Sequence, residues 1–184
     1  MPRPARTLAA AAVALALALP AGSARAATVL ATSVDQYVQG AGVVPARAVT
    51  ANALGAADGR FLSLGLGGSA TFGFGTRFSA PGAVVEVTFG DPRRAVESVD
   101  IYGLLGGVRS LLGSLTNLDD GTFRFTGVFD QLQFVDTTTA GGRGRDGYDI
   151  DAISVTPAPI PLPAAGSMLL IALGGLALMR RRRA

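Results

Sequence analysis

The 184-residue sequence predicts an all-β protein, an antiparallel β-sandwich of jelly-roll type, flanked by an N-terminal signal peptide and a single C-terminal transmembrane helix. Three observations support this fold class. Short runs in the middle of the chain alternate Phe or Val with other residues, which is typical of strands that bury one face. No stretch in that region has a helical apolar period over ten or more residues. Both ends of the chain carry long uncharged, apolar segments.

The central segment, residues 27–156, is expected to form the sandwich. It holds 21 of the 25 glycines and all nine phenylalanines, so turns and apolar strand residues are concentrated there. Pro81-Gly82, Asp120-Gly121 and Asp146-Gly147 are turn signals between the runs. We expect strands at 61–65, 69–74, 83–89, 97–102, 108–112, 122–126, 131–136 and 148–155. Strands at this spacing favour two packed antiparallel sheets, with residues 34–60 as a strand plus a loop.

The composition excludes several kinds of chemistry. All sixteen basic residues are Arg, and the chain has no His, Cys or Trp. It therefore has no disulfide, thiolate metal site, imidazole base or Schiff-base lysine. A glycosidase needs only two carboxylates, but nothing in the sequence pairs Glu86 or Glu97 with another acid. We expect that this protein is not an enzyme.

The positive charge of the chain belongs to its ends. The whole chain carries a formal net charge of +3, but residues 27–156 hold nine arginines against all thirteen acidic residues, which leaves them at −4. No stripe of basic residues interleaved with aromatic residues occurs in this segment. We therefore expect no nucleic-acid partner.

Residues 1–26 have the organisation of a secretory signal peptide. Arg3 and Arg6 precede an uncharged run from Leu8 to Leu19, and small residues precede the expected cut between Ala26 and Ala27. The alternative is an uncleaved anchor, but twelve helical residues at about 1.5 Å each are too short for a hydrocarbon core of about 30 Å. The sequence therefore predicts an exported domain.

Residues 157–184 contain a Pro-rich linker, an apolar segment and a basic end. Ile160 to Met179 is uncharged and long enough for one membrane crossing, and Arg180, Arg181, Arg182 and Arg183 follow at once. By the positive-inside rule these arginines stop translocation and stay in the cytoplasm. Pro161 and Pro163 hold the segment before the helix extended, and an extended segment is the form that suits a protease cleft.

This tail resembles a PEP-CTERM sorting signal, in the subtype whose motif is Val-Pro-Leu-Pro-Ala. The matching residues are Pro161, Leu162, Pro163, Ala164 and Ala165, followed by the apolar helix and Arg180–Arg183. Ile160 stands where the subtype usually has Val. The resemblance covers about 25 residues and implies cleavage by exosortase, a membrane-embedded enzyme of Gram-negative bacteria. It implies a transient single span in the inner membrane, then a cell-surface or extracellular location. The alternative is a permanent single-span anchor.

The central segment resembles, more loosely, galactose-binding-like jelly rolls. The resemblance lies in Phe61–Gly65, Gly67–Phe72 and Asp146–Ile153. It implies the fold and supplies no ligand.

The candidate metal ligands are Asp146, Asp149 and Asp151. Carboxylates two apart on a strand point to the same side, and Asp146 lies in the turn just before. Carboxylate oxygens with loop carbonyls suit Ca²⁺, the only cofactor that the sequence suggests, although the spacing is not that of an EF-hand loop. The alternative is a turn residue with two solvated or Arg-paired carboxylates.

Two functions remain open from the sequence. One is a structural or adhesive protein of the cell surface or matrix, sorted by its tail into the exopolysaccharide layer. The alternative is a carbohydrate-binding module, with or without Ca²⁺, in which Tyr37, Tyr102 or Tyr148 stacks on sugar rings or instead belongs to the core or its rim.

Overall fold

The structure is a computed structural model that describes residues 27–91, 93, 95–139, 146–159 and 173–174. The expected signal peptide with Ala26, the motif Pro161–Ala165 and the basic cluster Arg180–Arg183 lie outside these residues. Of the expected membrane segment only Leu173 and Gly174 are described, both in helical conformation. Within the described ranges, no helix has the length and apolarity needed to cross a membrane.

The described chain is a set of antiparallel strands with two short 3₁₀ turns. The strands are β1 (Val29–Leu30), β2 (Ser33–Val38), β3 (Leu62–Ser63), β4 (Ser69–Glu86), β5 (Ser98–Leu105), β6 (Val108–Thr116), β7 (Thr122–Phe123), β8 (Phe129–Asp136) and β9 (Asp149–Pro157). The 3₁₀ turns η1 (Pro45–Arg47) and η2 (Thr50–Ala53) lie between β2 and β3.

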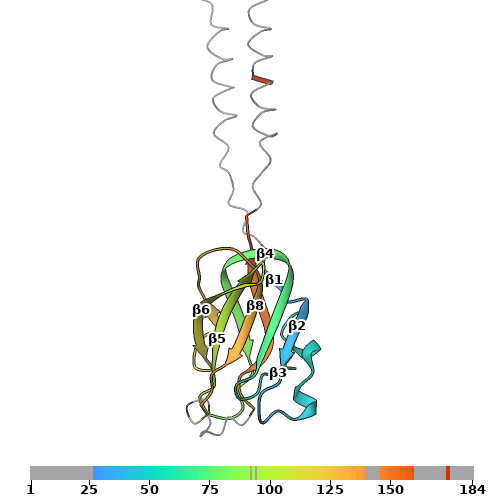
Figure 1. Ribbon diagram of the computed structural model, residues 1–184, viewed down its shortest axis with the longest axis vertical. Coiled ribbons are helices and arrows are strands. Elements are labelled where there is room, and N and C mark those ends of the chain that lie inside the picture. The colour runs from blue at the N-terminus through green and yellow to red at the C-terminus, as the bar shows by residue number, and fades with distance from the viewer. Residues whose placement is uncertain (1–26, 92, 94, 140–145, 160–172, 175–184) are drawn as a thin grey trace, which may run out of the picture.

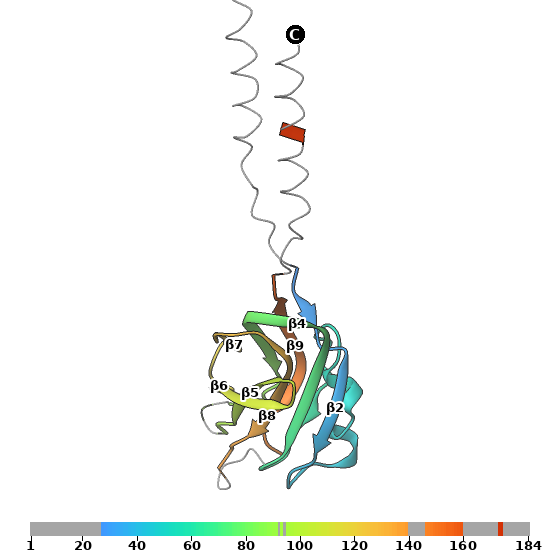
Figure 2. The same ribbon diagram turned by 45° about the horizontal axis from the view of Figure 1, so that its top comes forward.

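The long strand β4 belongs to both layers of a sandwich. Its first part, from Ser69, pairs with β2 and β8, and β5 and β6 continue that layer. Its second part, ending at Glu86, pairs with β9 and β7, and β1 and β3 add to the outer edge of β9. The strand bends over one end of the molecule between the two parts (Figures 1 and 2). Gly75, with a φ of +67°, lies in this bend.

The predicted antiparallel β-sandwich is confirmed, with corrected strand limits. The expected strands 69–74 and 83–89 belong to one strand, β4. Its backbone pairs with β8 before the bend and with β9 after it, so no separate turn divides the two parts. Strand β7 is only two residues long, whereas β5, β6 and β8 extend beyond their expected limits. Residues 34–60 contain most of β2 and both 3₁₀ turns.

The core lies between the layers and is rich in phenylalanine. Strand β5 buries Val99 and Ile101 and turns Asp100 outward, as the alternation predicts. The rings of Phe72 and Phe134 meet edge to face across neighbouring strands, with centroids 5.7 Å apart. The sandwich is therefore held chiefly by apolar burial in its interior.

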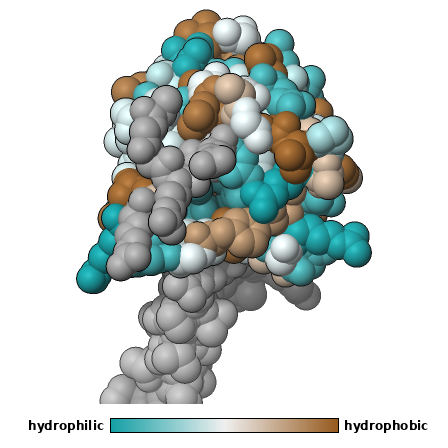
Figure 3. Space-filling model, turned by 90° about the horizontal axis from the view of Figure 1, so that it is seen from below, coloured by the Kyte–Doolittle hydropathy of each residue, from teal (hydrophilic) through white to brown (hydrophobic). Residues whose placement is uncertain are grey.

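The two ends of the sandwich differ. Strand β1 and the last residues of β9 lie at one end, near the bend of β4 (Figure 2). The longer connections gather at the opposite end, which we call the distal end. Its segments are residues 39–61, 64–68, 87–97, 117–121 and 137–148, of which residues 92, 94 and 140–145 are not described. Viewed from there, apolar and polar side chains are mixed on the described surface (Figure 3).

Candidate functional site

An arginine covers two aromatic rings at the distal end. The centroids of Phe61 and Phe89 are 5.3 Å apart, and the guanidinium carbon of Arg47 lies 5.3 Å from the first ring centre and 4.8 Å from the second. Arg47 ends η1, whereas Phe89 follows β4. The guanidinium also donates to the carboxylate of Asp146, which fixes it above the rings. Phe89 remains 56% exposed.

Two carboxyl groups, those of Asp146 and Asp149, meet at Ser63 on the interior side of Arg47. The Ser63 hydroxyl donates to Asp149, and its oxygen lies 3.4 Å from Oδ2 of Asp146. Asp149 is only 1% exposed. Burial raises the pKa of Asp149 to about 7, while the hydrogen bond from Ser63 opposes that rise. This carboxyl therefore titrates near neutral pH.

Glu86 and Glu97 form a second pair of carboxyl groups. Glu86 ends β4 and Glu97 precedes β5, and their carboxyl groups are within hydrogen-bond range of each other. Burial, followed by the charges of Asp149 and Glu86, raises the pKa of Glu97 to about 9, and burial raises the pKa of Glu86 as well. Two carboxyls can hydrogen bond only when one carries a proton. The pair therefore shares a proton at neutral pH, which the raised pKa of Glu97 assigns to that residue.

A hollow of about 390 Å³ opens beside Glu86, and we call it the distal hollow. Its polar lining residues are Glu86, Thr88, Asn117, Asp119, Asp120 and Tyr148. They come from the end of β4, the β6–β7 connection and the start of β9, which the antiparallel register brings together. Hydrogen bonds from Thr116 hold the pKa of Asp119 below its usual range, so this carboxylate stays charged. The volume is within the range of small-molecule sites.

Asp136 binds several segments of the distal end through hydrogen bonds. Its carboxylate accepts hydrogen bonds from the backbone N–H groups of Gly67 at 3.1 Å and Tyr148 at 2.8 Å, and from the backbone and hydroxyl of Thr138. It is 3% exposed. These bonds join two connections to the end of β8 and fix the start of the segment that carries Asp149.

The three predicted calcium ligands do not stay together. Asp146 and Asp149 meet at Ser63. Asp151 instead accepts the backbone N–H groups of Asp58 at 3.1 Å and Gly59 at 2.9 Å. Among the described residues, no group of three or more His, Cys, Asp or Glu side chains is arranged to hold a metal ion. Calcium binding stays a prediction, with two of its three expected ligands in one place.

The tyrosines lie in different surroundings. Tyr148 is 1% exposed and lines the floor of the distal hollow. The Tyr37 hydroxyl donates to the carbonyl of Ser63 at 2.8 Å. The guanidinium carbon of Arg109 lies 3.4 Å from the ring centre of Tyr102, which covers that ring. The half-exposed aromatic ring of the candidate site is therefore Phe89 and none of these.

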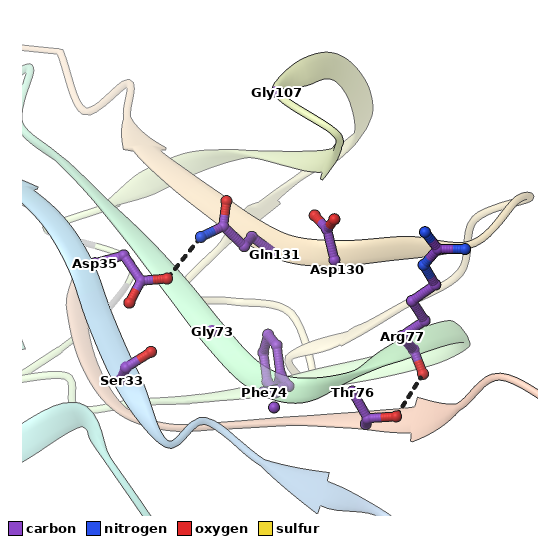
Figure 4. Close-up of a pocket in the computed structure, with 10 residues that line it drawn as sticks. Ser33, Asp35, Gly73, Phe74, Thr76, Arg77, Gly107, Asp130 and Gln131 are labelled. Atoms are coloured by element: carbon purple, nitrogen blue, oxygen red, sulfur yellow. Dashed lines mark hydrogen bonds between the residues drawn. The ribbon is translucent and has the colours of Figure 1, made fainter.

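A second groove, of about 550 Å³, lies at the other end of the sandwich (Figure 4). Asp35 on β2 and Gln131 on β8 face each other across it, joined by a hydrogen bond of 2.6 Å. Arg77 lies on its far side, and the carbonyl of Arg77 accepts the N–H of Ala158 near the end of β9. This groove is open and polar, and its ring, Phe74, is 2% exposed. It therefore presents no aromatic surface to a ligand.

The sequence patterns do not identify Arg47, Phe61 and Phe89 as site residues, and they do not pair Glu86 with Glu97. Phe89 is the last residue of the expected strand 83–89, and the glycine directly after it is the one local feature that marks a strand end there. No local signal pairs Arg47 with Asp146, because 99 residues separate them.

Comparison with known proteins gives fold neighbours only. No protein-family model and no curated protein matches the chain. Three solved structures resemble it: a truncated AlyQ with CBM32 and alginate lyase domains, the family 32 CBM of C. perfringens NanJ with galactose, and GH31 CBM32-2 bound to GalNAc. In that order, their identities are 14%, 18% and 12% and their TM-scores 0.46, 0.37 and 0.38. In the same order, the matches cover 75%, 50% and 72% of this chain, and 36%, 67% and 99% of the other chains. The chain therefore spans about a third of the truncated AlyQ chain.

Proposed function

We propose that this protein is an exported carbohydrate-binding domain whose distal end contacts a glycan. The observation that carries the proposal is the half-exposed Phe89 ring, held against Phe61 under the Arg47 guanidinium. The proposal rests on these residues at the distal end of the sandwich.

A sugar ring needs two kinds of contact, and both are present. Its C–H face packs on an apolar ring, which Phe89 offers with a fixed orientation. Its hydroxyl groups need hydrogen-bond acceptors and donors, which the carboxylate of Asp146 and the guanidinium of Arg47 supply. Because Arg47 is already bound to Asp146, the polar groups are ordered before the ligand arrives, which lowers the entropic cost of binding.

The C-terminal segment of the chain suits this role. The resemblance of residues 157–184 to a PEP-CTERM tail supports export, a transient inner-membrane span and cutting by exosortase near Pro161–Ala165. The described part of the tail leaves the sandwich at the end opposite the distal end (Figure 1). A domain held by this tail would present its distal end away from the membrane. We therefore propose a cell-surface or extracellular polysaccharide as the partner.

A glycan array probed with the full chain tests the proposal. Phe89→Ala is expected to weaken binding about 3- to 10-fold, the usual worth of one aromatic contact. Leu111→Ala removes another exposed apolar side chain, 59% exposed on β6, and should leave binding unchanged. Binding to no glycan at all would overturn the proposal and favour the structural or adhesive role.

A further inference from the structure

The distal hollow is lined by acids and by no base among the described residues. Glu86, Asp119 and Asp120 contribute three carboxyl groups, whereas the nearby Arg47 is already bound to Asp146. Asp119 and Asp120 lie on the β6–β7 connection and reach the hollow from its exposed rim. A ligand that enters this space meets an excess of negative charge.

On the interior side of the same group, the carboxyl of Glu97 lies against that of Glu86. Glu97 is 8% exposed, and neither its Oε2 nor Oε1 of Glu86 has a hydrogen-bond partner among the N–H and O–H groups of the described chain. Glu97 is directed at Glu86, which lines the hollow, and Asp149 is close enough to act on its charge. Two carboxyls that face each other away from water are costly unless a positive charge or a proton compensates them.

We propose that the distal hollow binds the protonated amine of an amino-sugar glycan, so that the preferred ligand is a polymer of de-N-acetylated hexosamine. This inference rests on the proposed carbohydrate-binding function and names its ligand class. A hollow of about 390 Å³ exceeds the size of a metal ion and accommodates a sugar residue. The amine meets Glu86 and the rim carboxylates. Asn117 donates to the carbonyl of Ala95 and accepts the N–H of Glu97, and Thr88 donates to Glu86, so these two side chains hold the wall of the hollow in place.

The charge of the hollow also determines which glycans it rejects. A polyuronate would bring carboxylates against Glu86, Asp119 and Asp120, and like charges at an interface oppose binding. A fully N-acetylated polymer lacks the positive charge and retains only uncharged contacts with the hollow. The expected order of affinity is de-N-acetylated, then N-acetylated, then uronate polymer.

The test measures binding of the full chain to three immobilised polymers: poly-glucosamine, poly-N-acetylglucosamine and a polyuronate. The measurement is made at a mildly acidic pH, at which the sugar amines carry protons. The double variant Asp119→Asn/Asp120→Asn keeps the side-chain shapes and removes two charges. It should bind poly-glucosamine about 3- to 10-fold more weakly and poly-N-acetylglucosamine as the wild type does.

The matched control is Asp130→Asn, which removes a charge from the groove at the other end and should change neither affinity. Equal loss in the control and the double variant, or preference for the neutral or uronate polymer, overturns this inference and leaves the proposed function standing. Loss of poly-glucosamine binding on adding a chelator also overturns it, because the carboxyls would then hold a metal. Binding to none of the polymers by wild type overturns it too, and the glycan array then decides the proposed function separately.

Discussion

The carboxyl groups of Glu86 and Glu97 lie within hydrogen-bond range of each other at the distal end, although Glu86 ends β4 and Glu97 directly precedes β5. No N–H or O–H of the described residues satisfies Oε1 of Glu86 or Oε2 of Glu97. A proton or ligand charge that neutralises this pair should therefore change both the free energy of unfolding and the affinity of the proposed site.

The folded protein should lose stability as the pH rises. The pKa of Glu97 is about 9 in the folded state and 4.5 as an unperturbed group, so the folded state binds the extra proton between these values. The stabilisation is complete below about pH 4.5 and is lost toward pH 9, with a slope of at most about 1.4 kcal/mol per pH unit for one proton. Urea unfolding at several pH values measures this slope.

The substitution Glu97→Gln tests the origin of that slope. It removes the titrating proton but keeps a side chain of the same size that can donate to Glu86. The variant should show a flatter dependence of unfolding free energy on pH, whereas Asp130→Asn at the other end should keep the wild-type slope. An unchanged slope in Glu97→Gln would assign the effect to another group, with Asp149 the first candidate because its pKa is about 7.

Asp136→Ala should destabilise the domain by about 2–4 kcal/mol. The change leaves the backbone N–H groups of Gly67 and Tyr148 without their acceptor in a buried place. Asp136→Asn retains one acceptor oxygen and should cost less. Thermal unfolding measured for both variants checks the order, and an Ala variant as stable as wild type would contradict the role given to this carboxylate.

Gly103→Ala should destabilise the sandwich by about 1–3 kcal/mol, the usual cost of overpacking. A Cβ at this position would lie 2.6 Å from the Phe129 ring on the neighbouring strand β8. Ser110→Ala lies opposite Gly103 on β6 and is exposed, so it serves as a control that should change stability little. Chemical denaturation of both variants distinguishes a packing effect from a general loss of sheet stability.

A reporter fused to residues 157–184 should be cut near Pro161–Ala165 in a host that has exosortase. In a host without the enzyme, the reporter should stay full length and bound to the membrane, because four arginines each cost about 2.5–3.5 kcal/mol at the helix centre and stop transfer. Pro161→Ala/Pro163→Ala should leave uncut precursor in the first host. Identical full-length products in both hosts would instead indicate a permanent anchor.

The sequence alone predicted the antiparallel sandwich and most of its strands. Period-two alternation is a local property, and runs such as Val99-Asp100-Ile101 show which side chains enter the core without knowledge of their neighbours. The same local patterns missed the continuity of β4, because the Gly75–Gly82 region carries glycines and a proline that normally end a strand. Only pairing with β9 and β7 shows that the strand continues.

The candidate site was decided by the tertiary structure. Spacing along the strand paired Asp149 with Asp151, but Asp149 meets Asp146 at Ser63, whereas Asp151 meets the 58–59 backbone. Which loop lies above a given strand position depends on long-range register, which alternation does not encode. The same reason explains Arg47 beside Asp146 and Glu86 beside Glu97: each pair joins segments that become neighbours only when the two layers close.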